Sequence, residues 1–83
     1  MKIVYFAWLR ERTGLTEEDV APPATVKDVG GLVTWLATRS DGHARAFAEP
    51  GQIRAAVNQE YARLDHPVAA GDEIAFFPPV TGG

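Results

Sequence analysis

The residues best suited to chemistry close the sequence. Two prolines, Pro78 and Pro79, are followed by Val80, Thr81, Gly82 and Gly83. Glycine has no Cβ atom and wide φ/ψ freedom, so a Gly-Gly end can pass through a narrow channel. Six residues extend at most about 20 Å. The pattern is typical of a flexible C-terminal tail, residues 78–83, that places the Gly83 carboxylate, with Gly82 beside it, near a reactive centre. Frayed chain ends are often rich in glycine too, so the pattern gains weight only when joined to a small domain that ends on its last strand.

Composition excludes several other kinds of chemistry. The chain has no cysteine and only two histidines, His43 and His66, so a cysteine zinc site, a thiol nucleophile and a histidine-rich metal site are all excluded. Eight Lys and Arg against eleven Asp and Glu give a net charge of −3, which argues against nucleic acid as a partner. No apolar run reaches the roughly 18 residues of a membrane span, so we expect a cytoplasmic protein without a membrane partner.

The first half of the chain predicts two strands and one helix. Residues 2–9 are apolar on both faces, and alternation separates Ile3, Tyr5 and Leu9 from Phe6 and Trp8. Residues 10–14 form a short helical turn that ends at a glycine, and residues 15–20 form a weaker, acidic strand. Apolar residues at helical spacing predict a helix over residues 26–39, with a capping box at its start.

The second half predicts a strand over residues 53–57, a returning strand over residues 61–64 and a last strand over residues 73–77. Strand, strand, helix and three strands indicate an α+β fold in which one main helix packs on one face of a mixed sheet of about five strands. The last strand can lie parallel to the first in the middle of the sheet. This is the ubiquitin-like β-grasp arrangement, and we assign it to residues 1–77, although other small α+β folds share the pattern.

Aromatic residues of the uncovered sheet face form a candidate partner surface. We expect Phe6, Trp8, Tyr61 and Phe77 on or beside that face, close to the tail. An exposed apolar patch of this kind normally marks a protein interface. The alternative is that loops cover some of these rings.

Several segments together resemble a known family. They are KIVYFAWLRE at residues 2–11, AVNQ at residues 56–59, LDHP at residues 64–67 and GDEIAFFPPVTGG at residues 71–83. The sequence is similar to the small, sulfur-carrier subunits of molybdopterin synthase, which are ubiquitin-like sulfur carriers. The resemblance covers the whole chain.

The resemblance implies a carrier cycle for molybdenum cofactor biosynthesis. An E1-like adenylyltransferase would use ATP and Mg²⁺ to adenylate Gly83, and a sulfur donor protein would convert the adenylate into a thiocarboxylate. The tail would then deliver sulfur to a pterin precursor inside the large subunit of molybdopterin synthase, within a heterotetramer. Arg10 matches a family position near the partner contact, as do residues 78–81 of the tail. This chain would bind no cofactor and no metal, and it would be a carrier whose catalytic groups lie on the large subunit.

Three alternatives remain open from the sequence. The chain could be a ubiquitin-like sulfur carrier for thiamine, cysteine or tRNA thiolation, a protein modifier that forms isopeptide bonds with lysines, or an interaction domain with an inert tail. We also expect its acidic residues, among them Glu17, Glu18, Asp19, Asp72 and Glu73, to speed docking onto basic partner surfaces.

Overall fold

A computed structural model describes residues 1–79 of the chain. Five strands, three α-helices and one short 3₁₀ helix make up the described part, and no helix in it is long and apolar enough to cross a membrane. In chain order they are β1 (Lys2–Tyr5), α1 (Trp8–Thr13), β2 (Glu17–Asp19), α2 (Val29–Leu36), α3 (Asp41–Ala46), η1 (Pro50–Gln52), β3 (Arg54–Val57), β4 (Glu60–Ala62) and β5 (Glu73–Phe77).

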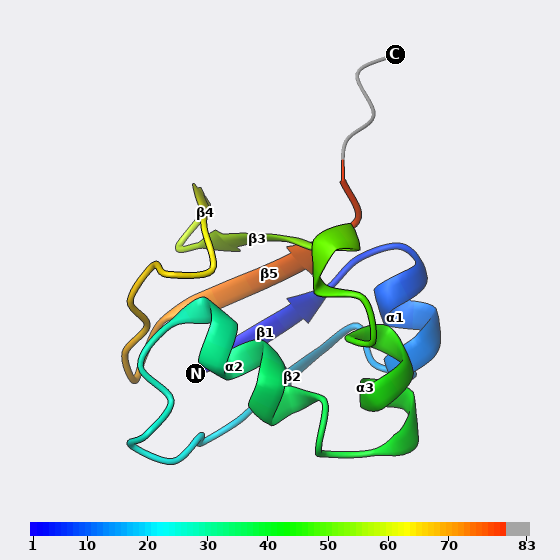
Figure 1. The fold of residues 1–83 in the computed structure, drawn as a ribbon, viewed down its shortest axis with the longest axis horizontal. Coiled ribbons are helices and arrows are strands. Elements are labelled where there is room, and N and C mark those ends of the chain that lie inside the picture. The colour runs from blue at the N-terminus through cyan, green and yellow to red at the C-terminus, as the bar shows by residue number, and fades with distance from the viewer. Residues whose placement is uncertain (80–83) are drawn as a thin grey trace.

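The strands form one mixed sheet in the order β2-β1-β5-β3-β4. β1 and β5 are parallel at its centre, where Tyr5 pairs with Phe76, and the other neighbours are antiparallel. In Figure 1, α2 lies across one face of the sheet, and α1 and α3 lie at the end toward which the arrows of β1 and β5 point. The β-grasp prediction is therefore confirmed.

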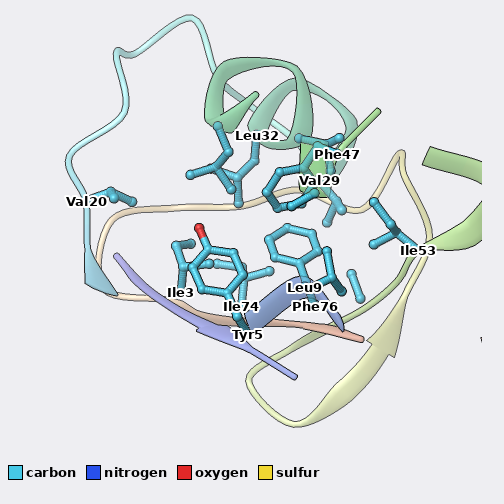
Figure 2. Packing of buried hydrophobic residues seen from close by; sticks show 14 of the residues in the cluster. Ile3, Tyr5, Leu9, Val20, Val29, Leu32, Phe47, Ile53, Ile74 and Phe76 are labelled. Carbon is cyan, nitrogen blue, oxygen red and sulfur yellow. The ribbon is translucent and has the colours of Figure 1, made fainter. Parts of the chain in front are cut away.

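Alternation along the strands and the apolar stripe of α2 build the core. In β5, Ile74 and Phe76 are fully buried, whereas Phe77 turns to the other face and stays partly exposed. Figure 2 shows Ile74 and Phe76 packed with the other core side chains between the sheet and the helices. Burying each large apolar side chain contributes roughly 1.5–3 kcal/mol. α2 contributes four core residues at helical spacing: Val29, Leu32, Val33 and Leu36.

The predicted first strand was too long. β1 ends at Tyr5, because Ala7 adopts φ 53° and ψ −132°, which takes the chain out of the extended conformation and begins α1 at Trp8. Leu9 is buried as expected, but it reaches the core from α1 and not from the strand. The predicted end of this turn is confirmed, since Gly14 has a left-handed φ of 76°.

The main helix is shorter at both ends than the predicted residues 26–39, since α2 spans Val29–Leu36. Asp28 is itself the N-cap, and its carboxylate accepts a 2.7 Å hydrogen bond from the amide of Gly31. The expected capping box at residues 25–28 was therefore wrong. Ser40 caps a further helix, α3, and its side chain accepts a hydrogen bond from the amide of His43.

Close contact between α3 and α1 depends on the absence of a side chain at residue 42. A Cβ atom on Gly42 would collide with the carbonyl oxygen of Arg12. We expect Gly42→Ala to lower the free energy of unfolding by about 1–3 kcal/mol, as overpacking generally does. Urea denaturation measures this. Gly51→Ala is the matched control, since nothing lies within 4 Å of its Cβ position, and equal losses for both variants would contradict the packing argument.

Candidate functional site

The sheet face opposite α2 holds a shallow groove of about 570 Å³. Phe6, Tyr61, Phe77 and Pro78 line it, together with three smaller residues, Ala56, Gln59 and Ala75. Phe6 is 49% exposed and Tyr61 is 81% exposed, which is unusual for large aromatic side chains. We call this surface the aromatic groove. It gathers three of the four aromatic residues that the sequence predicted for a partner surface.

Two small side chains make the floor of the aromatic groove. Ala56 of β3 pairs directly with Ala75 of β5, and Tyr61 of β4 pairs with Ala56 on its other side. The ring of Tyr61 lies 5.8 Å from that of Phe77, tilted by 60°. Sequence reasoning missed Ala56, Gln59 and Ala75 as groove residues, although alternation from Phe77 could have found Ala75.

Trp8 and Arg10 lie outside the aromatic groove. Because α1 replaces the end of the predicted strand, Trp8 faces a small polar hollow that it shares with Arg12, Glu49 and Gln52. The guanidinium of Arg12 stands 4.4 Å above its ring, a cation–π contact that holds the indole in place. Arg10 is exposed on α1, and its partner role stays a prediction.

The predicted tail is described only at its start. Pro78 and Pro79 follow β5 directly and are partly exposed, with Pro78 at the edge of the aromatic groove. Proline cannot donate to a strand ladder, so β5 ends at Phe77. The predictions for Val80, Thr81, Gly82 and Gly83 lie outside the described residues.

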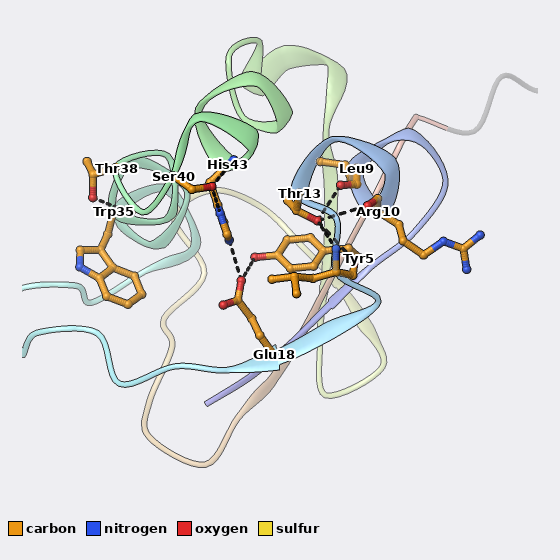
Figure 3. Close-up of polar contacts among 10 residues, drawn as sticks. Tyr5, Leu9, Arg10, Thr13, Glu18, Trp35, Thr38, Ser40 and His43 are labelled. Carbon is orange, nitrogen blue, oxygen red and sulfur yellow. Dashed lines mark hydrogen bonds and ion pairs between the residues drawn. The ribbon is translucent and has the colours of Figure 1, made fainter.

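A cluster of hydrogen-bonded polar side chains lies on the helical side of the sheet, as Figure 3 shows. Glu18 of β2 accepts 2.7 Å hydrogen bonds from the hydroxyl of Tyr5 and from Nε2 of His43. The ionised carboxylate can only accept, so Nε2 of His43 carries a proton. Nδ1 of His43 lies 2.7 Å from the hydroxyl of Ser40. The sequence analysis counted Glu18 among the acidic residues expected to aid docking, but its side chain is only 14% exposed and bonds inward to Tyr5 and His43.

The environment of Glu18 keeps it ionised. Burial, the largest influence, acts to raise the pKa of Glu18, but hydrogen bonds from His43 and Tyr5 outweigh it and hold that pKa below the usual 4.5. Burial, reinforced by the hydrogen bond to Glu18, also raises the pKa of Tyr5, so Tyr5 remains a donor. The cluster therefore joins β1, β2 and α3 on the side of the sheet opposite the aromatic groove. Among residues 1–79, no group of three His, Cys, Asp or Glu side chains is arranged to hold a metal ion.

We expect Glu18→Gln to lower the free energy of unfolding by roughly 1–3 kcal/mol at neutral pH, since two hydrogen bonds to a charged acceptor are replaced. The pKa of Glu18 is lower in the folded chain than in the unfolded chain, so its ionised form stabilises the fold. This stabilisation is complete at pH values above the pKa of Glu18 in the unfolded chain, and it is lost as the pH falls through the pKa of Glu18 in the folded chain. Urea denaturation between neutral pH and pH values below 4.5 checks both statements. The control is Glu17→Gln, which removes only an exposed ion pair with Lys2. An equal loss in both variants at neutral pH would contradict the prediction.

Comparison with known proteins places the chain in a family. The ThiS family model matches residues 3–83, and the chain belongs to that family. It is 46% identical to the molybdopterin synthase sulfur carrier subunit of Escherichia coli, covering 100% of this chain and 99% of that protein. It is 39% identical to the protein of the same name from Haemophilus influenzae, with the same coverage. These relationships support a sulfur carrier role in molybdenum cofactor biosynthesis.

A solved structure extends the comparison. The crystal structure of SAMP1 from Haloferax volcanii matches with a TM-score of 0.74 and 32% identity, covering 100% of this chain and 98% of that one. The β-grasp domain is thus shared with a protein that is described as a small archaeal modifier.

Proposed function

We propose that this chain carries sulfur on the carboxylate of Gly83, as a thiocarboxylate, and donates it to a pterin precursor. The single observation that carries the proposal is full-length similarity to molybdopterin synthase sulfur carrier subunits, from the first strand through the Gly-Gly end. A carboxylate is a weak electrophile, so it has to be activated. Adenylation supplies a good leaving group, which a sulfur nucleophile then displaces.

The activation needs groups that other proteins supply. We propose an E1-like adenylyltransferase that uses ATP and Mg²⁺, and a separate sulfur donor protein. The chain has no cysteine, so it offers no thiol of its own for carrying sulfur. On this proposal it binds no cofactor, works in the cytoplasm and acts as a reactant and carrier.

The aromatic groove is the proposed docking surface for the large subunit of molybdopterin synthase. Its exposed rings, Phe6 and Tyr61, flank Phe77 at the point where β5 leads into Pro78. A partner that covers these rings therefore receives the residues that follow Pro78. Aromatic anchors in a partly closed groove are typical of binding hot spots. We propose a heterotetramer with one carrier at each end of a large-subunit dimer.

A second candidate function has support from one specific observation. The similarity to small archaeal modifier protein 1, at 38% identity, favours a role as a protein modifier. Both roles begin with adenylation of the terminal glycine, and they differ in the nucleophile that follows. A lysine amine would give an isopeptide bond, and a sulfur donor would give the thiocarboxylate.

Reconstitution of sulfur transfer tests the proposal. The thiocarboxylated chain, the large subunit and the pterin precursor are mixed, and the dithiolene product is measured in a single turnover. We expect product in proportion to the thiocarboxylated carrier, with none from the carboxylate form. Absence of product in this mixture, together with lysine conjugates when the carboxylate form is incubated separately with the adenylyltransferase, ATP and Mg²⁺, would refute the sulfur carrier role and support the modifier.

A further inference from the structure

Positive charge gathers at the end of the sheet where β5 finishes. Arg10 and Arg12 belong to α1, Arg45 belongs to α3, and Arg54 begins β3 opposite Phe77. All four arginines are exposed, and we call them the arginine collar. Figure 1 shows α1 and α3 at the end to which the β1 and β5 arrows point. Three acidic residues, Glu11 of α1, Asp41 of α3 and Glu49 before η1, lie among these elements, so the four arginines leave only a small excess of positive charge.

The collar charges are not neutralised within the described part of the chain. Ion pairs there join Lys2 to Glu17 and Glu73, and His43 to Glu18, and none of them includes an arginine. The collar hydrogen bonds that are present use neutral acceptors. Arg12 donates to the carbonyl of Arg45, and Arg54 donates to two backbone carbonyls. The guanidinium charges are therefore available to a partner.

The opposite end of the sheet is acidic. Asp72 precedes β5, Glu73 begins it, Glu60 begins β4, and Asp19 ends β2. Lys2 and the N-terminal ammonium lie at this end too, so four acidic side chains there outnumber two positive groups. Charge is thus separated along the strand direction, with the positive pole at the Phe77 end. Asp72 and Glu73 lie at the far end of β5 from Phe77, whereas Glu17 pairs with Val4 toward the other end of β1. The expectation that acidic residues speed docking onto basic partner surfaces stays a prediction.

We propose that the arginine collar docks against an acidic rim on the large subunit, around the site that receives the tail. This inference rests on the proposed function. The collar is continuous with the aromatic groove, since Arg54 pairs with Phe77 in neighbouring strands. A partner that covers the groove therefore lies beside Arg54, and on this proposal it extends to the other three arginines. A basic rim would juxtapose like charges, which costs affinity, whereas an acidic rim complements them.

The charge separation also orients the approach of the chain. A domain with one positive pole turns that pole toward an acidic surface before contact, and this raises the association rate more than it slows dissociation. Added salt screens the effect, because the Debye length falls from about 30 Å at 0.01 M to about 3 Å at 1 M. Association should therefore slow as salt rises.

Stopped-flow association of the full chain with the large subunit tests the proposal. The test variant combines Arg45→Gln with Arg54→Gln. The matched control combines Lys27→Gln with Arg39→Gln, exposed residues outside the collar, and removes the same two charges. We expect the collar variant to associate about fivefold more slowly at low salt, the control to change less than about twofold, and the difference to vanish near 1 M salt.

Two results would overturn the inference while the proposed function stands. Equal slowing in both double variants would mean that only net charge matters. Faster association of the collar variant would mean that the rim of the partner is basic. Thermal unfolding of both variants confirms that each remains folded. If the unaltered chain fails to bind the large subunit at all, the proposed function itself fails, and the inference fails with it.

Discussion

Deleting Gly83 is expected to abolish thiocarboxylate formation and to leave the fold intact. The reactive carboxylate would then belong to Gly82, one residue short of its position in the activating site. Extended chain covers about 3.3–3.6 Å per residue, and a misplacement of even 1 Å can cost about a hundredfold in rate. Mass spectrometry after incubation with the adenylyltransferase, ATP and the sulfur donor measures the product.

The deletion needs a control that separates chemistry from folding. Gly82→Val keeps the terminal carboxylate but adds a branched side chain, and we expect it to block loading as well. Gly51→Val adds the same side chain at a residue with open space around it, and it should load normally. Thermal unfolding should be unchanged for the two tail variants. Normal sulfur transfer by the truncated chain would refute the carrier role.

Phe77→Ala is expected to weaken binding to the large subunit by about 2 kcal/mol or more, which is roughly a thirtyfold rise in Kd. The physical reason is that Phe77 lies in the aromatic groove, in contact distance of Tyr61, and would be fully buried only when a partner covers it. Isothermal titration calorimetry with the large subunit measures the change.

The neighbouring ring supplies the matched control for Phe77. Phe76 is fully buried and packs with its ring centre 5.1 Å from that of Phe47, so Phe76→Ala should cost about 3–5 kcal/mol of folding stability. Phe77→Ala should cost clearly less. Equal or reversed stability losses would contradict the assignment of Phe77 to the partner face.

Much of the fold could be predicted from local patterns. The alternation in residues 73–77 predicted β5 with its correct bounds and separated Phe76 from Phe77. Gly14 predicted the end of α1 because a left-handed residue there favours glycine. These features depend on the periodicity and backbone preferences of single residues, which a sequence displays directly.

The errors arose where tertiary contacts override local preference. Residues 6–9 have strand-like composition, but Ala7 takes a positive φ and Leu9 gains its burial from a helix. Glu18 stands in an acidic run that is typical of a solvated edge. The Glu18 side chain turns inward because two hydrogen-bond donors lie there, the hydroxyl of Tyr5 and the ring of His43, which is 25 residues away in the sequence. No local pattern contains either partner.

The candidate site was predicted unevenly for the same reason. Alternation placed Tyr61 and Phe77 correctly, and it placed Phe6 on the same face although Phe6 lies just after the end of β1; the structure brings all three into one groove. Trp8 lies outside the groove because β1 ends at Tyr5 and Trp8 begins α1. The arginine collar was missed because α1, α3 and β3 are brought to one end of the sheet only by the fold.

The most direct test of the sulfur carrier role is the intact mass of the full chain after incubation with the E1-like adenylyltransferase, ATP, Mg²⁺ and the sulfur donor. Omitting ATP provides the control. The account predicts that the mass increases by the exchange of one oxygen for one sulfur, that fragmentation places the change at Gly83, and that the change requires ATP. An unchanged mass in the complete mixture, or sulfur at any other residue, would contradict it.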